Sequence, residues 1–188
     1  MAIKIFIDQG HNPQNPNAGA EGNGLREQDL TYTIGVMLAD LLRANPNFEV
    51  KLSRNSPEEI LGTSNSTSLQ ARVNAANEWG ADYFISLHTN ASLESSASGI
   101  EGYVYSTGSP AYALSEDIVD WLNRTTGLRN RGVFTRPGLY VLRKTQMPAT
   151  LIEMGYITNP RDAALMNEQP ELFATGIYNG ILDYFGLL

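Results

Sequence analysis

The chain has 188 residues, enough for a core that buries most of its apolar surface without disulfides, and we expect one domain spanning residues 1–188. Thirteen basic residues against 20 acidic ones give a formal charge of -7, which argues against electrostatic binding to nucleic acid or to an anionic membrane surface. The chain has no cysteine, so disulfides and thiolate-bound zinc are excluded, and a metal ion would have to be bound by His, Asp or Glu.

The N-terminal sequence MAIKIFID is a strand-like run. It lacks the basic segment, the long apolar core and the small-residue cleavage site of a signal peptide. No apolar run approaches the roughly 20 residues that a membrane-spanning helix needs. We therefore expect a soluble chain without signal peptide or membrane insertion, whose export would use another route or a segment outside this chain.

The first half of the chain predicts strands that alternate with helices. Apolar residues at 30, 34, 38, 41 and 42 lie on one face of a helix, and Thr67 with Gln70 has the spacing of a capping box. In chain order we expect a strand at 3–8, a long loop at 12–24, a helix from 27 to 45, a strand at 48–52, an exposed loop at 55–67 and a helix at 67–80.

The second half continues the same alternation. We expect strands at 83–87, 100–105, 139–142 and 150–153, an irregular segment at 128–138, and helices at 110–127, from 160 onwards and at 172–185. The connection at 91–98 is too short for a helical crossover, so one of its flanking strands should pair antiparallel or lie at the sheet edge. The pattern predicts an α/β fold: a single three-layer domain with a mostly parallel, twisted sheet of about six strands and helices on both faces.

Polar residues follow three of the predicted strands: His11, His88 and Glu153. In open α/β sheets the ligand crevice lies at the carboxyl ends of the strands, so these side chains can share one crevice. Glu27, at a helix start after the long loop, can join them. Two imidazoles and one carboxylate form the ligand set of a catalytic zinc, and the remaining carboxylate would be free to act as a base in amide hydrolysis.

Position alone leaves other roles open. Either histidine could be a turn residue, Glu27 could be a favourable charge in a first helical turn, and Glu21 is a rival carboxylate in the loop. Asp8 could orient His11 or cap the turn. Glu153 has the strongest local case for a function, because it ends the apolar run at 149–152 and would be partly desolvated there.

Three further residues are candidates for substrate binding: Asn90, Arg131 and Arg143. Either arginine could hold a substrate carboxylate, although solvated or structural arginines are the more common case.

Five segments and one residue carry a resemblance to a known family: IDQGH, GLREQDL, ADYFISLHTNA, NRGV, LYVLRKTQMPATLIEMGYITN and the following Asp162. Together they span essentially the whole chain, and their sequences and order are similar to those of the zinc-dependent N-acetylmuramoyl-L-alanine amidases called amidase 3. The resemblance implies cleavage of the amide bond between N-acetylmuramic acid and L-alanine in peptidoglycan. It implies one zinc ion on His11, Glu27 and His88, with Glu153 as general acid/base, and it favours Glu27 over Glu21 because Glu27 matches the motif.

The chain departs from this family at Asn12-Pro13, where members often have a second glycine-rich turn. It also carries no wall-binding module, so we expect a separate one. These features suggest the catalytic part of an endolysin or of a larger autolysin, which acts on the bacterial cell wall and, if endolysin-like, stays in the cytoplasm until release. The alternatives are a zinc hydrolase of another amide or ester and a catalytically inactive wall-binding module.

Overall fold

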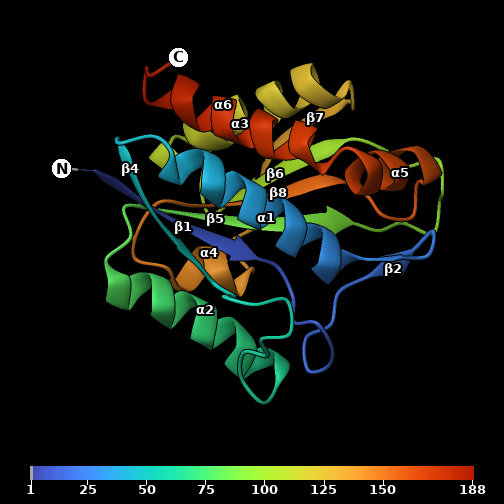
Figure 1. Ribbon diagram of the computed structural model, residues 1–188, viewed down its shortest axis with the longest axis horizontal. Coiled ribbons are helices and arrows are strands. Elements are labelled where there is room, and N and C mark those ends of the chain that lie inside the picture. The colour runs from blue at the N-terminus through green and yellow to red at the C-terminus, as the bar shows by residue number, and fades with distance from the viewer. Residues whose placement is uncertain (1) are drawn as a thin grey trace.

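A six-stranded sheet forms the centre of the computed structural model, which describes residues 2–188 (Figure 1). The strand order is β4-β1-β5-β8-β6-β7. All pairs in this sheet are parallel except β6 with β8, so the first of the two arrangements expected from the short connection before β6 is the one present. The strands are β1 (Ile3–Gln9), β4 (Phe48–Leu52), β5 (Tyr83–Asn90), β6 (Ile100–Val104), β7 (Asn130–Thr135) and β8 (Ala149–Tyr156).

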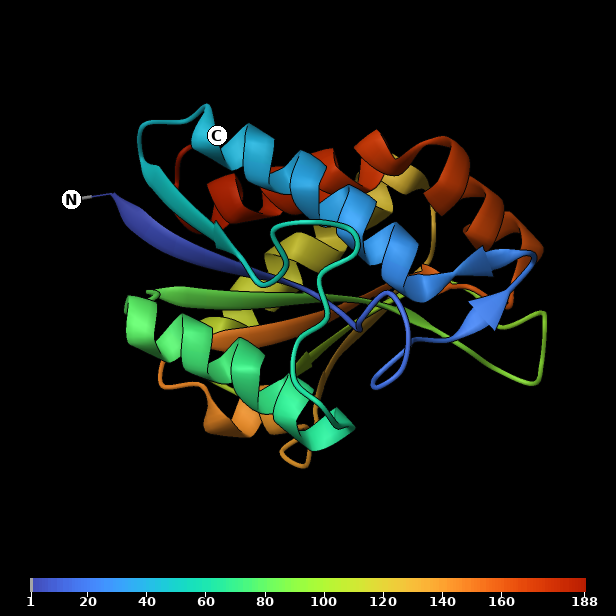
Figure 2. The same cartoon turned by 60° about the horizontal axis from the view of Figure 1, so that its bottom comes forward.

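Helices cover both faces of the sheet, as predicted. Helices α1, α3 and α6 lie on one face, and α2 and α4 lie side by side on the other (Figures 1 and 2). No helix within residues 2–188 is long and apolar enough to cross a membrane. The helices are α1 (Glu27–Arg43), α2 (Asn65–Trp79), α3 (Pro110–Thr126), α4 (Tyr140–Lys144), α5 (Pro160–Glu168) and α6 (Pro170–Tyr184).

The smaller core, between the sheet and α2 with α4, ends where the candidate site begins. Phe6 and Phe84 stack there with ring centroids 5.6 Å apart, and Leu151 of β8 packs in the same cluster. Side chains two residues apart along a strand lie on the same face. The residues that follow on this face toward the carboxyl ends are therefore His88 and Glu153, and the apolar face gives way to a polar one.

The predictions for residues 128–142 are wrong. The segment expected to be irregular contains β7, an edge strand in which no residue is fully buried, so it lacks the apolar pattern that marks a buried strand. The strand expected at 139–142 is the short helix α4, in which Val141 and Leu142 are buried. A short apolar run fits a buried helix and a buried strand equally well, and packing against α2 decides this one.

Two boundaries and one loop also differ from prediction. Ser64, not Thr67, caps α2, and Thr67 completes the capping box as its third helical residue. The long loop before α1 contains a small antiparallel pair, β2 (Glu21–Gly22) and β3 (Leu25–Arg26). Strand β8 continues beyond 153 to Tyr156, so Glu153 lies within the strand and not after it.

Candidate active site

Three side chains converge at the carboxyl ends of the central strands: His11, Glu27 and His88. His11 follows β1, Glu27 is the first residue of α1, and His88 lies near the end of β5. The carboxylate of Glu27 lies between the two rings, with its Oε2 3.2 Å from His11 Nε2 and its Oε1 3.2 Å from His88 Nδ1. One donor atom from each residue lies within 4.8 Å of the other two. The convergence predicted from strand ends is therefore present.

Glu27 is buried and strongly hydrogen-bonded. Its carboxylate also accepts hydrogen bonds from the backbone N–H groups of Ala20, at 2.9 Å, and Thr89, at 2.8 Å. Burial by itself would raise the pKa of Glu27, but the hydrogen bonds and charges of His11 and His88 outweigh it and lower the pKa well below its usual range. The group is thus an anion ready to bind a cation.

The donor set fits a zinc ion. Zinc accepts imidazole nitrogen and carboxylate oxygen at about 2 Å, and three protein ligands that leave one position open are typical of a catalytic site. The observed donor atoms are close enough to reach such distances after small movements. In the chain described here, this cluster is the one group of three or more potential ligands that meets that spacing.

Two glycines make room for the cluster. A Cβ atom on Gly10 would lie 2.5 Å from the His88 ring and from the Leu87 carbonyl oxygen. A Cβ atom on Gly19 would lie 2.9 Å from the His11 ring and 2.8 Å from Glu27. Any side chain at either position would displace a member of the cluster.

Glu153 lies beside the cluster in β8. It pairs in register with His88 of β5 on one side and with Glu101 of β6 on the other. Its Oε2 atom is buried and has no hydrogen-bond partner among residues 2–188. Burial raises the pKa of Glu153 to about 8, and the negative charges of Glu27 and Glu101 add to this effect. A carboxyl group with this pKa can both accept and donate a proton near neutral pH.

Glu101 is a second buried carboxylate, but its hydrogen bonds are satisfied. It accepts hydrogen bonds from the Tyr103 hydroxyl at 2.5 Å, from the Tyr156 hydroxyl at 3.0 Å and from Arg131 Nε at 2.5 Å. Burial opposes ionisation of Glu101, but these three donors lower its pKa below the usual value. The two neighbouring glutamates therefore differ: Glu101 is held as an anion, whereas Glu153 is free to gain and lose a proton.

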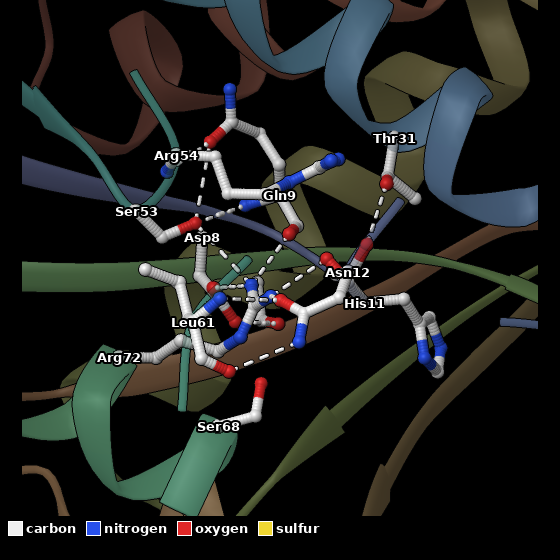
Figure 3. A network of polar contacts seen from close by, with 12 residues as sticks. Asp8, Gln9, His11, Asn12, Thr31, Ser53, Arg54, Leu61, Ser68 and Arg72 are labelled. Atoms are coloured by element: carbon white, nitrogen blue, oxygen red, sulfur yellow. Dashed lines mark hydrogen bonds and ion pairs between the residues drawn. The ribbon is translucent and has the colours of Figure 1, made fainter. Parts of the chain in front are cut away.

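A buried polar network fixes the backbone of His11 (Figure 3). His11 has a φ of 69°, in the left-handed region that few non-glycine residues adopt. Arg72 of α2 donates from Nη2 to the His11 carbonyl oxygen at 2.6 Å and from Nη1 to the Gln9 carbonyl oxygen at the same distance. The side chain of Asn12 donates to the carbonyl oxygens of Pro16 and Leu61. These contacts hold the turn that aims the His11 ring at Glu27.

Asp8 does not orient the His11 ring, which corrects one of the two roles considered for it. Its Oδ1 accepts a hydrogen bond from Arg72 Nη1 at 2.7 Å, and its Oδ2 accepts one from Ser86 at 2.8 Å. Burial opposes ionisation of Asp8, but the charge and hydrogen bond of Arg72 lower its pKa. Asp8 thus acts on His11 only through Arg72.

Replacing Arg72 with methionine is expected to lower the free energy of unfolding by about 3–5 kcal/mol, because the change leaves the Asp8 carboxylate buried without its partner. Urea denaturation measures the effect. Arg43→Met is the matched control, since Arg43 pairs with Asp40 at the exposed surface and should cost less than about 1 kcal/mol. Equal losses in the two variants would contradict this interpretation of the network.

Comparison with known proteins identifies the family. Residues 5–183 match the family described as N-acetylmuramoyl-L-alanine amidase, Amidase_3. The chain belongs to this family.

Individual relatives agree with the assignment. The chain is 37% identical over 189 residues to the N-acetylmuramoyl-L-alanine amidase CwlM of Bacillus licheniformis, covering 98% of this chain and 70% of that protein. It is 31% identical over 196 residues to an endolysin of Bacillus phage SPP1, covering 100% of this chain and 68% of that protein. The solved catalytic domain of CwlV, an amidase of Bacillus (Paenibacillus) polymyxa, has a TM-score of 0.86 and 28% identity, and the match covers 99% of each chain.

The three predicted substrate-binding residues of this amidase lie at different distances from the metal-ligand cluster. Arg131 lies at the edge of the site, paired with Glu101. Asn90 ends β5 two residues after His88, and its side-chain oxygen accepts a hydrogen bond from the backbone N–H of Ala91. Arg143 is not brought to the cluster: it lies on α4, is exposed, and lines a separate groove with Tyr105 and Met147.

Sequence reasoning missed the roles of Arg72, Glu101 and Tyr156. The buried position of Arg72 could have been predicted from the sequence. It lies on the apolar stripe of α2 with Leu69 and Ala76, where a solvated arginine would not be expected. Glu101 lies on the inward face of an alternating strand. Tyr103 lies two residues away on the same strand. The other two partners, Arg131 of β7 and Tyr156 of β8, could not be found from the sequence, because their position depends on sheet order.

Proposed function

We propose that this chain is a zinc-dependent hydrolase of the amide bond between N-acetylmuramic acid and L-alanine in bacterial peptidoglycan. The observation that carries the proposal is the His11–Glu27–His88 cluster beside the buried, unpartnered Glu153, in a chain of the amidase family. The same four residues are those that the motifs of the sequence assign to metal binding and proton transfer.

His11, Glu27 and His88 would hold the zinc ion. When bound, zinc supplies Lewis acidity for the scissile carbonyl oxygen and for the attacking water. Glu153 accepts the proton of the water as the carbonyl carbon is attacked. It then donates that proton to the departing nitrogen of L-alanine, so that the amine leaves as a neutral group. Burial of Glu153 suits both steps, because it brings the two protonation states of its carboxyl group close in free energy.

The proposed substrate places the chain at the bacterial cell wall, as an endolysin-like or autolysin-like enzyme. Its partner is peptidoglycan, and the net charge of -7 gives the chain no general attraction to an anionic wall. A separate wall-binding domain would supply that attraction.

Digestion of purified muropeptides tests the proposal. The expected products carry a new free amino group on L-alanine and no new reducing sugar ends, and removal of the metal with EDTA followed by zinc addition should abolish and restore the reaction. New reducing ends would indicate glycan cleavage, and an inert wall substrate with hydrolysis of other amides or esters would indicate a different zinc hydrolase. Wall binding without hydrolysis and without zinc would indicate an inactive binding module.

A further inference from the structure

The order of the strands determines which groups lie on either side of Glu153 in the proposed site. In the sheet, β8 lies between β5 and β6, and β7 follows β6 at the edge. His88, Glu153 and Glu101 occupy one row across β5, β8 and β6 through the observed register. Glu153 therefore has the metal-ligand cluster on one side and the Glu101–Arg131 pair on the other.

The reaction fixes which end of the substrate lies on which side. The scissile carbonyl group must lie at the His11–Glu27–His88 cluster, and the departing nitrogen must lie within hydrogen-bond reach of Glu153. The chain that continues from that nitrogen is the stem peptide. A peptide that follows the row of His88, Glu153 and Glu101 leaves the cluster past Glu153, toward β6 and β7.

Arg131 is placed and oriented to meet that peptide. Glu101 binds its Nε atom at 2.5 Å, and Nη1 donates to the Ser98 carbonyl oxygen at 3.3 Å. The guanidinium lies 5.5 Å from the centre of the Tyr156 ring. The side chain is 35% exposed, and its Nη2 atom makes no hydrogen bond among residues 2–188. A guanidinium held in this way can bind a second carboxylate with little further loss of side-chain freedom.

The spacing matches one particular carboxylate. Neighbouring strands are about 4.8 Å apart, so β7 lies about 10 Å from β8. Two extended residues span about 7 Å, and the arginine side chain covers the rest. The second residue of a stem peptide is D-glutamate joined through its side chain, so its α-carboxyl group branches off at this distance. That group is either a free carboxylate or the neutral amide of D-isoglutamine.

Resting on the proposed function, we propose that the stem peptide runs from Glu153 across β6 to β7, and that Arg131, positioned by Glu101, binds the free α-carboxylate of its second residue. The enzyme then distinguishes stem peptides with D-glutamate from those with D-isoglutamine. The two differ in one group: the amide has an NH2 in place of one carboxylate oxygen and lacks the negative charge.

A two-by-two comparison tests the proposal. The wild-type chain and Arg131→Gln are each assayed on glycan strands whose stems carry D-glutamate or D-isoglutamine. The wild type is expected to have a kcat/KM about tenfold higher for the D-glutamate stem, mainly through KM, because the amide oxygen can still accept a hydrogen bond from Arg131 but lacks the negative charge of the carboxylate. Arg131→Gln should treat both stems alike, and Arg131→Lys should keep part of the preference.

Arg136→Gln is the matched control. Arg136 is also exposed, and its guanidinium lies 5.1 Å from the centre of the Tyr103 ring, but among residues 2–188 no hydrogen bond or ion pair joins it to Glu101. This variant should keep the wild-type ratio between the two stems. Equal wild-type rates on both stems, or a preference that persists in Arg131→Gln, would overturn the placement of the peptide. Absence of amide cleavage from both stems would instead contradict the proposed function itself, and this inference with it.

Discussion

Glu153→Gln is expected to lower kcat by about 100- to 10,000-fold on muropeptides while zinc binding is retained. Glutamine preserves the size of the side chain but cannot exchange a proton, and Glu153 is not one of the three clustered ligands. The measurement is single-turnover release of the L-alanine amino group together with elemental zinc analysis. Glu94→Gln changes an exposed glutamate in the loop after β5 and is the matched control, with wild-type kcat expected. Hydrolysis retained by Glu153→Gln would contradict the proposed mechanism.

The same substitution is expected to stabilise the metal-free chain at alkaline pH. The pKa of Glu153 is about 8 in the folded chain against an ordinary value of 4.5, so the folded state binds more protons between these values and loses stability as the pH rises through this window. Glutamine at position 153 does not ionise, so the variant does not lose this stability. The gain should be about 5 kcal/mol above pH 8 and should vanish below about pH 4.5. Urea denaturation in EDTA at several pH values measures it, and a gain that does not vary with pH would contradict the assignment.

His88→Ala is expected to remove zinc from the chain. The variant keeps only His11 and Glu27 as protein ligands, whereas catalytic zinc sites use three. Zinc content after dialysis should fall from about one ion per chain to near zero, and activity should fall with it. Because the chain has two histidines and both lie in the cluster, no other imidazole can replace His88.

A glutamate pair provides the control for the metal site. Glu27→Gln should lose zinc like His88→Ala, because the Glu27 carboxylate lies between both imidazoles. Glu21→Gln should keep it, because Glu21 is exposed on the short strand β2. Zinc retained by Glu27→Gln but lost by Glu21→Gln would reverse the choice between the two carboxylates.

Much of the fold follows from local patterns. The alternation of strands and helices, such as the buried run of β5 and the apolar stripe of α1, predicted the α/β fold. The short connection before β6 left two arrangements open, and the structure shows the antiparallel one. The two segments whose structure was predicted wrongly, β7 and α4, are short and lie at the edge or surface of the domain. Their local pattern fits more than one structure, and contacts with distant residues select among the alternatives.

The sequence by itself determined which chemistry is possible: with no cysteine and two histidines, a metal site had to use imidazole and carboxylate groups. It also placed His11, His88 and Glu153 at or near strand ends. Only the tertiary structure decided that Glu27 lies between both imidazoles, that Arg72 holds the His11 turn, and that Glu101 and Glu153 are neighbours with opposite electrostatic environments. The physical reason is that register and burial arise from pairing between strands far apart in the chain, which no local pattern encodes.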